Sequence, residues 1–255
     1  MKSIADLEIK LPKSLLIMGA PGSGKTTLAL QFPNIFVLDC DDNISGPIRY
    51  LRSRGIDMSN CFTDKPTTDS KGNAVEPGKE IDRSVELLTE ACESDKIDTI
   101  VIDSLTSFVN YMFLKVLSNE KKVIPKTWDR TCEKFSFSQW ASFEELMRRV
   151  LFWLKSSGKT IIWVAHIDYK ESPLTEEVQM FLAVPGKLKT ILPGWFEEVW
   201  YAYTVATGVG AGEKISRKIR TNPTNVMQAL GLKSGVGLTT TDQDIDKILT
   251  LLKGK

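Results

Sequence analysis

The chain has 255 residues, of which 42% are hydrophobic and 25% are charged, and this composition excludes disordered, collagen-like and disulfide-scaffold classes. Lys and Arg number 33 against 32 Asp and Glu, so a net charge of +1 indicates neither a nucleic-acid nor a membrane partner for the molecule as a whole. We expect a single domain over residues 1–255, with a core from about 14 to 240 and a short C-terminal helix over about 242–253.

The cysteines are spaced too widely to form a local metal or redox site. They lie 21 or more residues apart, at Cys40, Cys61, Cys92 and Cys132, and form no CxxC pair. This spacing indicates reduced thiols. No apolar run is long enough for the core of a signal peptide or for a membrane span. We therefore expect a cytoplasmic protein without a membrane partner.

Short apolar runs predict the strands of a sheet: Leu15–Met18, Ile35–Leu38, Thr99–Ile102, Thr160–Ala165 and Val199–Val205. Because these runs are continuously apolar, they suit strands that are buried on both faces of a parallel sheet. Helical periodicity lies between them, over 81–92 and 140–154. The alternation predicts a three-layer α/β fold, a mainly parallel central sheet flanked by helices. One more strand, over 214–221, would extend the sheet.

Three segments have no periodic pattern. Residues 61–79 are rich in Pro, Gly, Thr and charge, and predict an exposed loop or flexible hairpin. Residues 119–136 and 168–189 follow the C-terminal ends of strands, directly or after one helix. Ligands bind at that edge of an open α/β sheet, so both are candidate functional loops. A surface loop without a task is the alternative for each.

One segment matches the phosphate-binding pattern GxxxxGK[ST] in full: Gly19, Ala20, Pro21, Gly22, Ser23, Gly24, Lys25 and Thr26, with Thr27 next. A predicted strand precedes it and a helical segment follows, as this motif requires. Successive backbone N–H groups of such a loop converge on phosphate oxygens. We expect Lys25 to contact the β- and γ-phosphates from a solvent-facing position, and the Thr26 hydroxyl to bind Mg²⁺. The alternative is a glycine-rich turn without a ligand.

Carboxylates end two of the other predicted strands. Asp103 follows Thr99–Ile102, and we expect it to hold the magnesium ion; a helix N-cap is the alternative. Three more, Asp39, Asp41 and Asp42, end the second strand, where like charges repel each other unless cations gather there. One of these should orient or deprotonate the attacking water. The alternative is a solvated acidic turn that caps the following helix.

The single histidine, His166, ends the run 160–165 and so falls on the same sheet edge as Asp41 and Asp103. A neutral imidazole there can donate a hydrogen bond to a γ-phosphate oxygen or to the attacking water. A structural histidine with its hydrogen bonds satisfied is the alternative.

In chain order, the P-loop, LDCDD, IVIDS, VAH, PGKLK and FEEVWY resemble the phage RecA-like P-loop ATPases of the Sak type, over roughly residues 14–240. The resemblance implies a three-layer RecA-like P-loop NTPase fold and a Mg²⁺-dependent ATPase. It further implies action on single-stranded DNA in recombination or annealing, in the host cytoplasm if the protein is phage-encoded. A homo-oligomer, ring or filament, is implied as well, with a single-strand DNA-binding protein as a further partner.

The resemblance also assigns roles to residues. Asp41 takes the place of the glutamate that activates water, with Asp42 as a competitor, and His166 takes a polar sensor position before a DNA-binding loop over 168–189. That loop brings basic and aromatic residues together: Lys170, Lys187, Lys189, Tyr169 and Phe181, with Trp195 nearby. A late basic cluster would reach the neighbouring subunit's nucleotide: Arg217, Lys218 and Arg220, followed by Lys233. We expect Arg220 to be that residue, and a solvated edge strand is the alternative.

Other functions fit a P-loop less well here. A kinase of a small acceptor needs an arginine-rich lid, whereas 119–136 offers mainly Lys121, Lys122, Lys126 and Arg130. A GTPase is disfavoured because no NKxD base-reading motif occurs. A regulatory module that binds nucleotide and a protein partner, with little turnover, stays open.

Overall fold

The computed structural model describes residues 11–119, 136–171, 178–208, 214–235, 240–243 and 245–252. Its strands are β1 (Ser14–Gly19), β2 (Ile35–Asp39), β3 (Cys61–Asp64), β4 (Thr99–Asp103), β5 (Thr160–Glu171), β6 (Val178–Leu182), β7 (Glu198–Thr207), β8 (Lys214–Arg220) and β9 (Thr240–Asp242). Its helices are α1 (Lys25–Ala29), α2 (Ser45–Ser53), α3 (Glu80–Glu93), α4 (Leu105–Asn119), α5 (Phe137–Ser156), α6 (Leu188–Ile191) and α7 (Ile245–Leu252). Two short 3-10 helices span Leu192–Trp195 and Asn225–Leu230.

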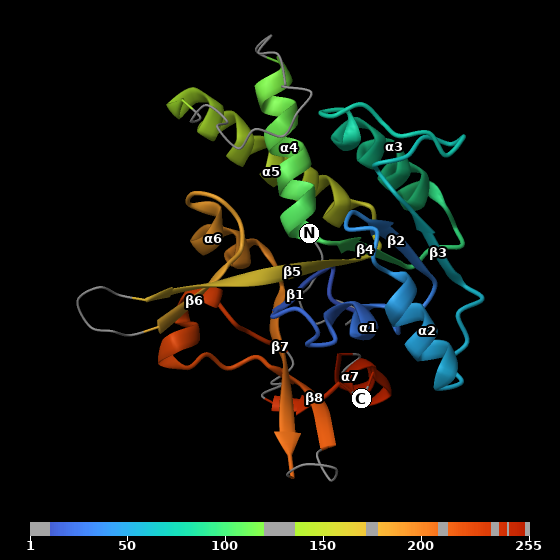
Figure 1. Cartoon of the computed structure of the whole chain (residues 1–255), viewed down its shortest axis with the longest axis vertical. Coiled ribbons are helices and arrows are strands. Elements are labelled where there is room, and N and C mark those ends of the chain that lie inside the picture. Colours follow the sequence, from blue (N-terminus) through green and yellow to red (C-terminus); the bar gives the residue numbers. More distant parts are fainter. Residues whose placement is uncertain are drawn as a thin grey trace, which may run out of the picture.

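The strands form one sheet in the spatial order β3-β2-β4-β5-β1-β7-β8-β9, with β6 paired to β5. The strands from β3 to β7 in this order run parallel, while β6, β8 and β9 are joined antiparallel. The strand β5 lies between β1 and β4, so the C-terminal ends of all three open onto the same edge (Figure 1).

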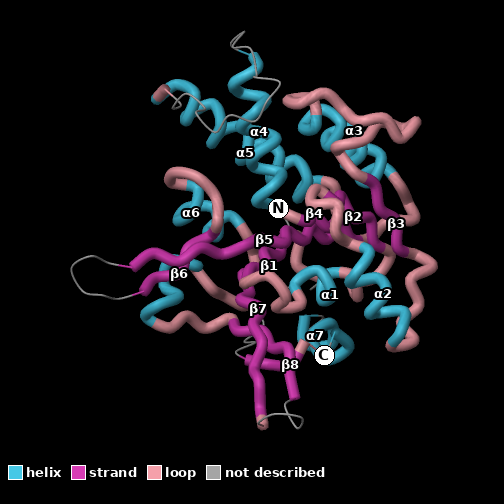
Figure 2. The backbone as a smooth tube through the Cα atoms, viewed as in Figure 1, coloured by secondary structure: helices cyan, strands magenta, loops and turns pink. Residues whose placement is uncertain are grey.

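Helices cover both faces of the sheet, which makes three layers (Figure 2). One core cluster joins alternate strand residues such as Leu16 to Leu88 of α3, Phe108 of α4 and Phe143 of α5. The other joins the intervening residues, including Leu15, to α1, α2 and α7. Because each central strand is buried on both faces, its sequence is continuously apolar. The predicted three-layer α/β fold with a mainly parallel sheet is confirmed.

The predicted elements agree with the structure apart from their ends. The five predicted strands correspond to β1, β2, β4, β5 and β7, and the run 214–221 is the antiparallel strand β8. The C-terminal helix expected over 242–253 is α7. No helix of the described residues is long and apolar enough to cross a membrane. Cys40, Cys61 and Cys92 are free thiols, while Cys132 lies outside the described residues.

Two of the three segments without a periodic pattern contain strands that the sequence did not predict. Residues 61–64 form β3, which is an edge strand among the described residues, pairs with β2 and is partly exposed, so it has no need of an apolar sequence. The rest of 61–79 contains the expected hairpin, in which Thr68 and Ala74 form an antiparallel bridge. In 168–189, β5 continues to Glu171 and pairs with β6 as a two-stranded ribbon beyond the layered core, with residues 172–177 outside the described part. Of 119–136, residues 120–135 also lie outside it.

Candidate nucleotide-binding site

The P-loop runs from the end of β1 to the start of α1, and its own backbone fixes it. Gly22 and Gly24 adopt φ angles of 78° and 91°, which side chains other than glycine rarely tolerate. The Ser23 N–H donates to the Ala20 oxygen at 3.2 Å. At Gly19, a Cβ atom would lie 2.2 Å from a carbonyl oxygen of β7, so only glycine fits. The loop is therefore held ready to receive a ligand.

Lys25 is buried, 5% exposed, and the expectation of a solvent-facing lysine was wrong. Its ammonium donates to the carbonyl oxygens of Gly19 at 2.9 Å and Ala20 at 2.8 Å. Burial lowers the pKa of Lys25 to about 8, although Asp103 and Asp41 oppose this shift. The lysine is thus a poorly solvated cation, to which an anionic ligand would bind strongly.

Thr26 and Asp103 bring two kinds of oxygen ligand together. The Thr26 hydroxyl donates to Oδ2 of Asp103 at 2.6 Å. Asp103 is 3% exposed, and burial raises its pKa to about 6 despite this hydrogen bond. A hydroxyl and a buried carboxylate are the hard oxygen ligands that Mg²⁺ prefers, so the residues fit the expected metal. The alternative was that Asp103 only caps a helix, but its carboxylate accepts a hydrogen bond from the Thr26 hydroxyl of the P-loop instead.

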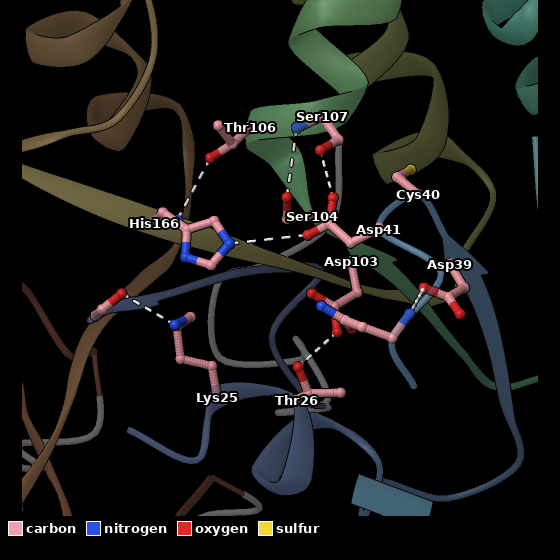
Figure 3. A network of polar contacts seen from close by, with 12 residues as sticks. Lys25, Thr26, Asp39, Cys40, Asp41, Asp103, Ser104, Thr106, Ser107 and His166 are labelled. Atoms are coloured by element: carbon pink, nitrogen blue, oxygen red, sulfur yellow. Dashed lines mark hydrogen bonds and ion pairs between the residues drawn. The ribbon is translucent and has the colours of Figure 1, made fainter. Parts of the chain in front are cut away.

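Asp41 and His166 face each other across the site (Figure 3). The Nε2 atom of His166 lies 3.7 Å from Oδ2 of Asp41. The Ser107 hydroxyl, on α4, donates to Oδ1 of Asp41. Burial alone would raise the pKa of Asp41, but the side chains of His166, Ser107 and Ser104 outweigh it, and the pKa is lower than usual. Asp41 is therefore an ionised carboxylate in a fixed position.

The other two carboxylates of the second strand end do different things. Asp42 points outward, with 67% of its side chain exposed, and pairs with Lys65. Asp39 accepts hydrogen bonds from the backbone N–H groups of Asn43 at 3.2 Å and Ile44 at 3.4 Å, before α2. Asp39 thus caps the following helix, as the alternative of an acidic turn expected, but it is buried rather than solvated. Asp41 is the one that the structure brings to the site.

His166 lies where β5 leaves the parallel sheet. It is level with Gly19 of β1, and its backbone N–H donates to the hydroxyl of Thr106 at 3.4 Å. Its Nδ1 atom is buried and has no hydrogen-bond partner among the described residues. The alternative of a structural histidine, in which both ring nitrogens are hydrogen-bonded, does not match this arrangement.

These side chains line one cavity of about 390 Å³. The expected residues on its wall are Pro21, Gly22, Gly24, Lys25, Thr26, Thr27, Asp41, Asp103 and His166. Five residues that we did not expect there also line it: Asn43, Gly46, Pro47 and Tyr50, in and just before α2, and Arg217 of β8. No sequence pattern pointed to Tyr50 or to this position of Arg217, since both depend on which elements pack beside the P-loop. Ser107 was missed for the same reason, because its contact with Asp41 depends on how α4 packs beside the end of β2.

The late basic residues do not share one face, because along β8 Arg217 lies on the opposite face from Lys218 and Arg220. The guanidinium of Arg220 stacks over the ring of Tyr203, with its carbon 5.7 Å from the ring centre. Lys233 pairs with Val199, near the start of β7. Neither Arg220 nor Lys233 lines the nucleotide cavity of its own chain, whereas Arg217 does.

The ribbon of β5 and β6 carries the residues expected to bind DNA. Tyr169 is 52% exposed and Lys170 is exposed beside it. The ammonium of Lys189 lies 5.1 Å from the centre of the Phe181 ring. Trp195 differs, because it is partly buried and packs against the core. Lys187 is exposed just before α6.

Comparison with known proteins gives one family. The family described as AAA domain matches residues 11–229. No curated protein sequence matches the chain. A solved structure titled "Crystal structure of the RadB recombinase" covers 82% of this chain and 80% of its own, with 11% identity and a TM-score of 0.45. Similarity at that level carries no conclusion about function.

Proposed function

The chain belongs to the AAA domain family, and from that premise we propose that it binds ATP with Mg²⁺ and hydrolyses it. The observation that supports this best is the convergence of four strand ends on one cavity. The P-loop supplies Lys25 and Thr26, β4 supplies Asp103, and Asp41 and His166 follow from the ends of β2 and the parallel part of β5. A cation that binds phosphate, a carboxylate that can hold the metal and polar side chains that can position the attacking water are the groups that phosphoryl transfer to water uses.

Each residue has one task in this proposal. The backbone of the P-loop and Lys25 hold the phosphates, and Thr26 and Asp103 hold Mg²⁺, which neutralises the phosphate charge. Asp41 orients the attacking water, because it is ionised and held by the Ser107 hydroxyl. His166 donates a hydrogen bond to the γ-phosphate or to that water.

We test the two water-side residues by separating binding from turnover. We expect Asp41→Asn and His166→Ala to lower phosphate release about a hundredfold or more while ADP affinity changes only a few-fold, since groups that act on the reacting atoms contribute mainly in the transition state. Binding is measured with a fluorescent ADP analogue and turnover by phosphate release.

The matched control is Asp42→Asn, which removes the neighbouring charge that points outward to Lys65. Its turnover should stay close to that of the wild type. A larger loss in Asp42→Asn than in Asp41→Asn, or equal losses of affinity and rate in Asp41→Asn, would show that the water-activating residue is a different one.

The finer proposal is that this ATPase is of the phage RecA-like Sak type and acts on single-stranded DNA as a homo-oligomer. The motifs LDCDD, IVIDS and VAH support the type. The ribbon and the neighbouring helix α6 support the partner, because Tyr169 of β5 offers an aromatic face, and Lys170 of β5 and Lys189 of α6 offer positive charge. Aromatic faces stack bases at about 1–3 kcal/mol each and lysines hold backbone phosphates, without reading the sequence. The β5 strand connects His166 at the cavity directly to this ribbon, so one element joins the two sites.

A further inference from the structure

Arg217 lies directly on the P-loop of its own chain. It stands in β8 opposite Thr204 of β7, and β8 runs beside the loop. A Cβ atom built on Gly24 would lie 2.5 Å from Cδ and 3.1 Å from Nε of Arg217. The arginine side chain therefore occupies the space that the glycine leaves free.

The guanidinium of Arg217 also stacks on Tyr50. Its carbon lies 4.8 Å from the centre of the Tyr50 ring, so a cation–π contact joins β8 to α2. Both residues line the nucleotide cavity, and both also line a second cavity of about 420 Å³ beside it, together with Thr27. The stacked pair thus forms the wall shared by the two spaces, next to the end of the P-loop.

One donor of Arg217 lacks an acceptor among the described residues. Its Nε atom is buried, with no hydrogen-bond partner in the part of the chain that the structure describes, and no ion pair with a carboxylate is found for it there. A buried donor without an acceptor is costly, and an arginine fork suits phosphate oxygens in particular. An anion in the cavity would satisfy this group.

The backbone holds Arg217 in this place. The Gln243 N–H donates to the Arg217 oxygen at 3.0 Å, and the Gln243 side-chain amide donates to the Ser23 oxygen in the P-loop at 2.9 Å. Gln243 therefore ties β8 to the loop, and Arg217 is positioned by its own chain.

We propose that Arg217 binds the phosphate chain of the nucleotide in the cavity of its own subunit, with Tyr50 holding the guanidinium in place. This inference rests on the proposed function, because it assumes that a nucleotide occupies the cavity. It differs from the role that the sequence suggested for the late basic cluster, which was to reach the neighbouring subunit's nucleotide.

The test measures the affinity for ADP by competition against a fluorescent analogue. We expect Arg217→Ala to weaken ADP binding about tenfold or more, because a charge-assisted hydrogen bond to phosphate is lost. Arg217→Lys should also weaken it, because a lysine cannot both stack on Tyr50 and present a planar fork. Tyr50→Ala should weaken it and Tyr50→Phe should not.

The matched control is Lys214→Ala, which removes an exposed positive charge from the same strand at a position that lines neither cavity. Its affinity for ADP should equal that of the wild type. Equal affinity in folded Arg217→Ala and Arg217→Lys, while the wild type binds ADP, would overturn this inference alone. A wild type that binds neither ADP nor ATP would instead overturn the proposed function.

Mixing experiments test whether Arg217 acts within its own subunit. At an ATP concentration that saturates the wild type but not Arg217→Ala, neither Arg217→Ala nor Lys25→Ala protein should release much phosphate. Mixing the two should not restore it, because every site then lacks one of the two groups. Recovery of phosphate release in mixtures shown to co-assemble would mean that Arg217 serves a neighbouring subunit, and would overturn the assignment.

Discussion

Lys25 and Asp103 are two buried charges of opposite sign at the base of the cavity, and burial disfavours the charged form of each. It lowers the pKa of Lys25 to about 8 and raises that of Asp103 to about 6. Both groups are still mainly charged near neutral pH, but the charged form of each is less favoured than in water. Binding relieves both: a phosphate pairs with Lys25 and a cation pairs with Asp103. The folded protein is thus less stable than it would be with neutral residues at these two positions, which is common where function needs buried charges.

A stability measurement tests this for Asp103. The pKa in the folded protein is above the usual value, so the folded state binds more protons than the unfolded state between about pH 4 and pH 6. The stability that this protonation contributes is present at low pH and is lost as the pH rises through 6. We expect Asp103→Asn to unfold at a higher temperature than the wild type at pH 7.5 without Mg²⁺, by about 2–3 kcal/mol in free energy.

That advantage should shrink towards zero as the pH falls below about 3, where Asp103 is protonated in both states. Thermal unfolding of both proteins at several pH values checks it. An Asn variant that is less stable than the wild type at pH 7.5 would contradict the raised pKa of Asp103.

At the scale of single residues, the residue pattern alone predicted which residue types gather at the site but not which of three neighbours faces inward. Only the resemblance to RecA-like ATPases favoured Asp41, with Asp42 as a competitor. Asp41 and Asp42 are adjacent and chemically identical, and only the turn that leads to α2, with a φ of 52° at Asp42, sends them in opposite directions. The sequence also did not indicate that Arg217 faces the cavity, because the direction of its side chain depends on the pairing of β8 with β7.

At the scale of elements, only the first part of β5 could be predicted as a strand from the sequence. Its first six residues are apolar and buried between β1 and β4, so a strand over 160–165 could be predicted. Its last residues are exposed and polar, and they are a strand only because β6 pairs with them in a ribbon. A solvated two-stranded ribbon needs no apolar pattern, which is why a loop was expected there.

The ribbon is the place to test DNA binding. We expect Tyr169→Ala, and separately Lys189→Ala, to weaken the binding of fluorescent single-stranded oligonucleotides several-fold, because a stacking face or a phosphate contact is lost. Affinity should fall steeply with salt and differ little between oligonucleotide sequences. Fluorescence anisotropy over a salt series measures both.

Lys71→Ala is the control, since Lys71 is exposed in the segment after β3, away from the ribbon. It should bind DNA like the wild type. If the Tyr169→Ala and Lys189→Ala proteins bind DNA as well as this control does, then the DNA contact lies elsewhere on the protein or does not exist.

At the scale of the whole molecule, the three layers were predictable because five strands carry the same continuously apolar pattern and are separated by helices. The assembly of subunits could not be predicted in this way, since an interface between subunits needs no continuously apolar pattern. Arg220 remains our prediction for a residue that serves a neighbouring subunit, as it lies over Tyr203 and away from its own cavity.

We expect Arg220→Ala to keep its nucleotide affinity and to lose the stimulation of ATP hydrolysis by single-stranded DNA, because an arginine supplied by a neighbour acts on the transition state. Mixing Arg220→Ala with Lys25→Ala should restore part of the activity, in contrast to mixtures that contain Arg217→Ala. No recovery, in mixtures shown by mass photometry to co-assemble, would mean that Arg220 acts within its own subunit or only structurally.

The most direct measurement is phosphate release from ATP by the purified wild type and by Lys25→Ala, each with and without Mg²⁺ and single-stranded DNA. We predict that the wild type releases phosphate only with Mg²⁺ and faster with DNA, and that Lys25→Ala, folded as shown by circular dichroism, releases none. Turnover by Lys25→Ala at the rate of the wild type would contradict the assignment of this cavity as the site of ATP hydrolysis.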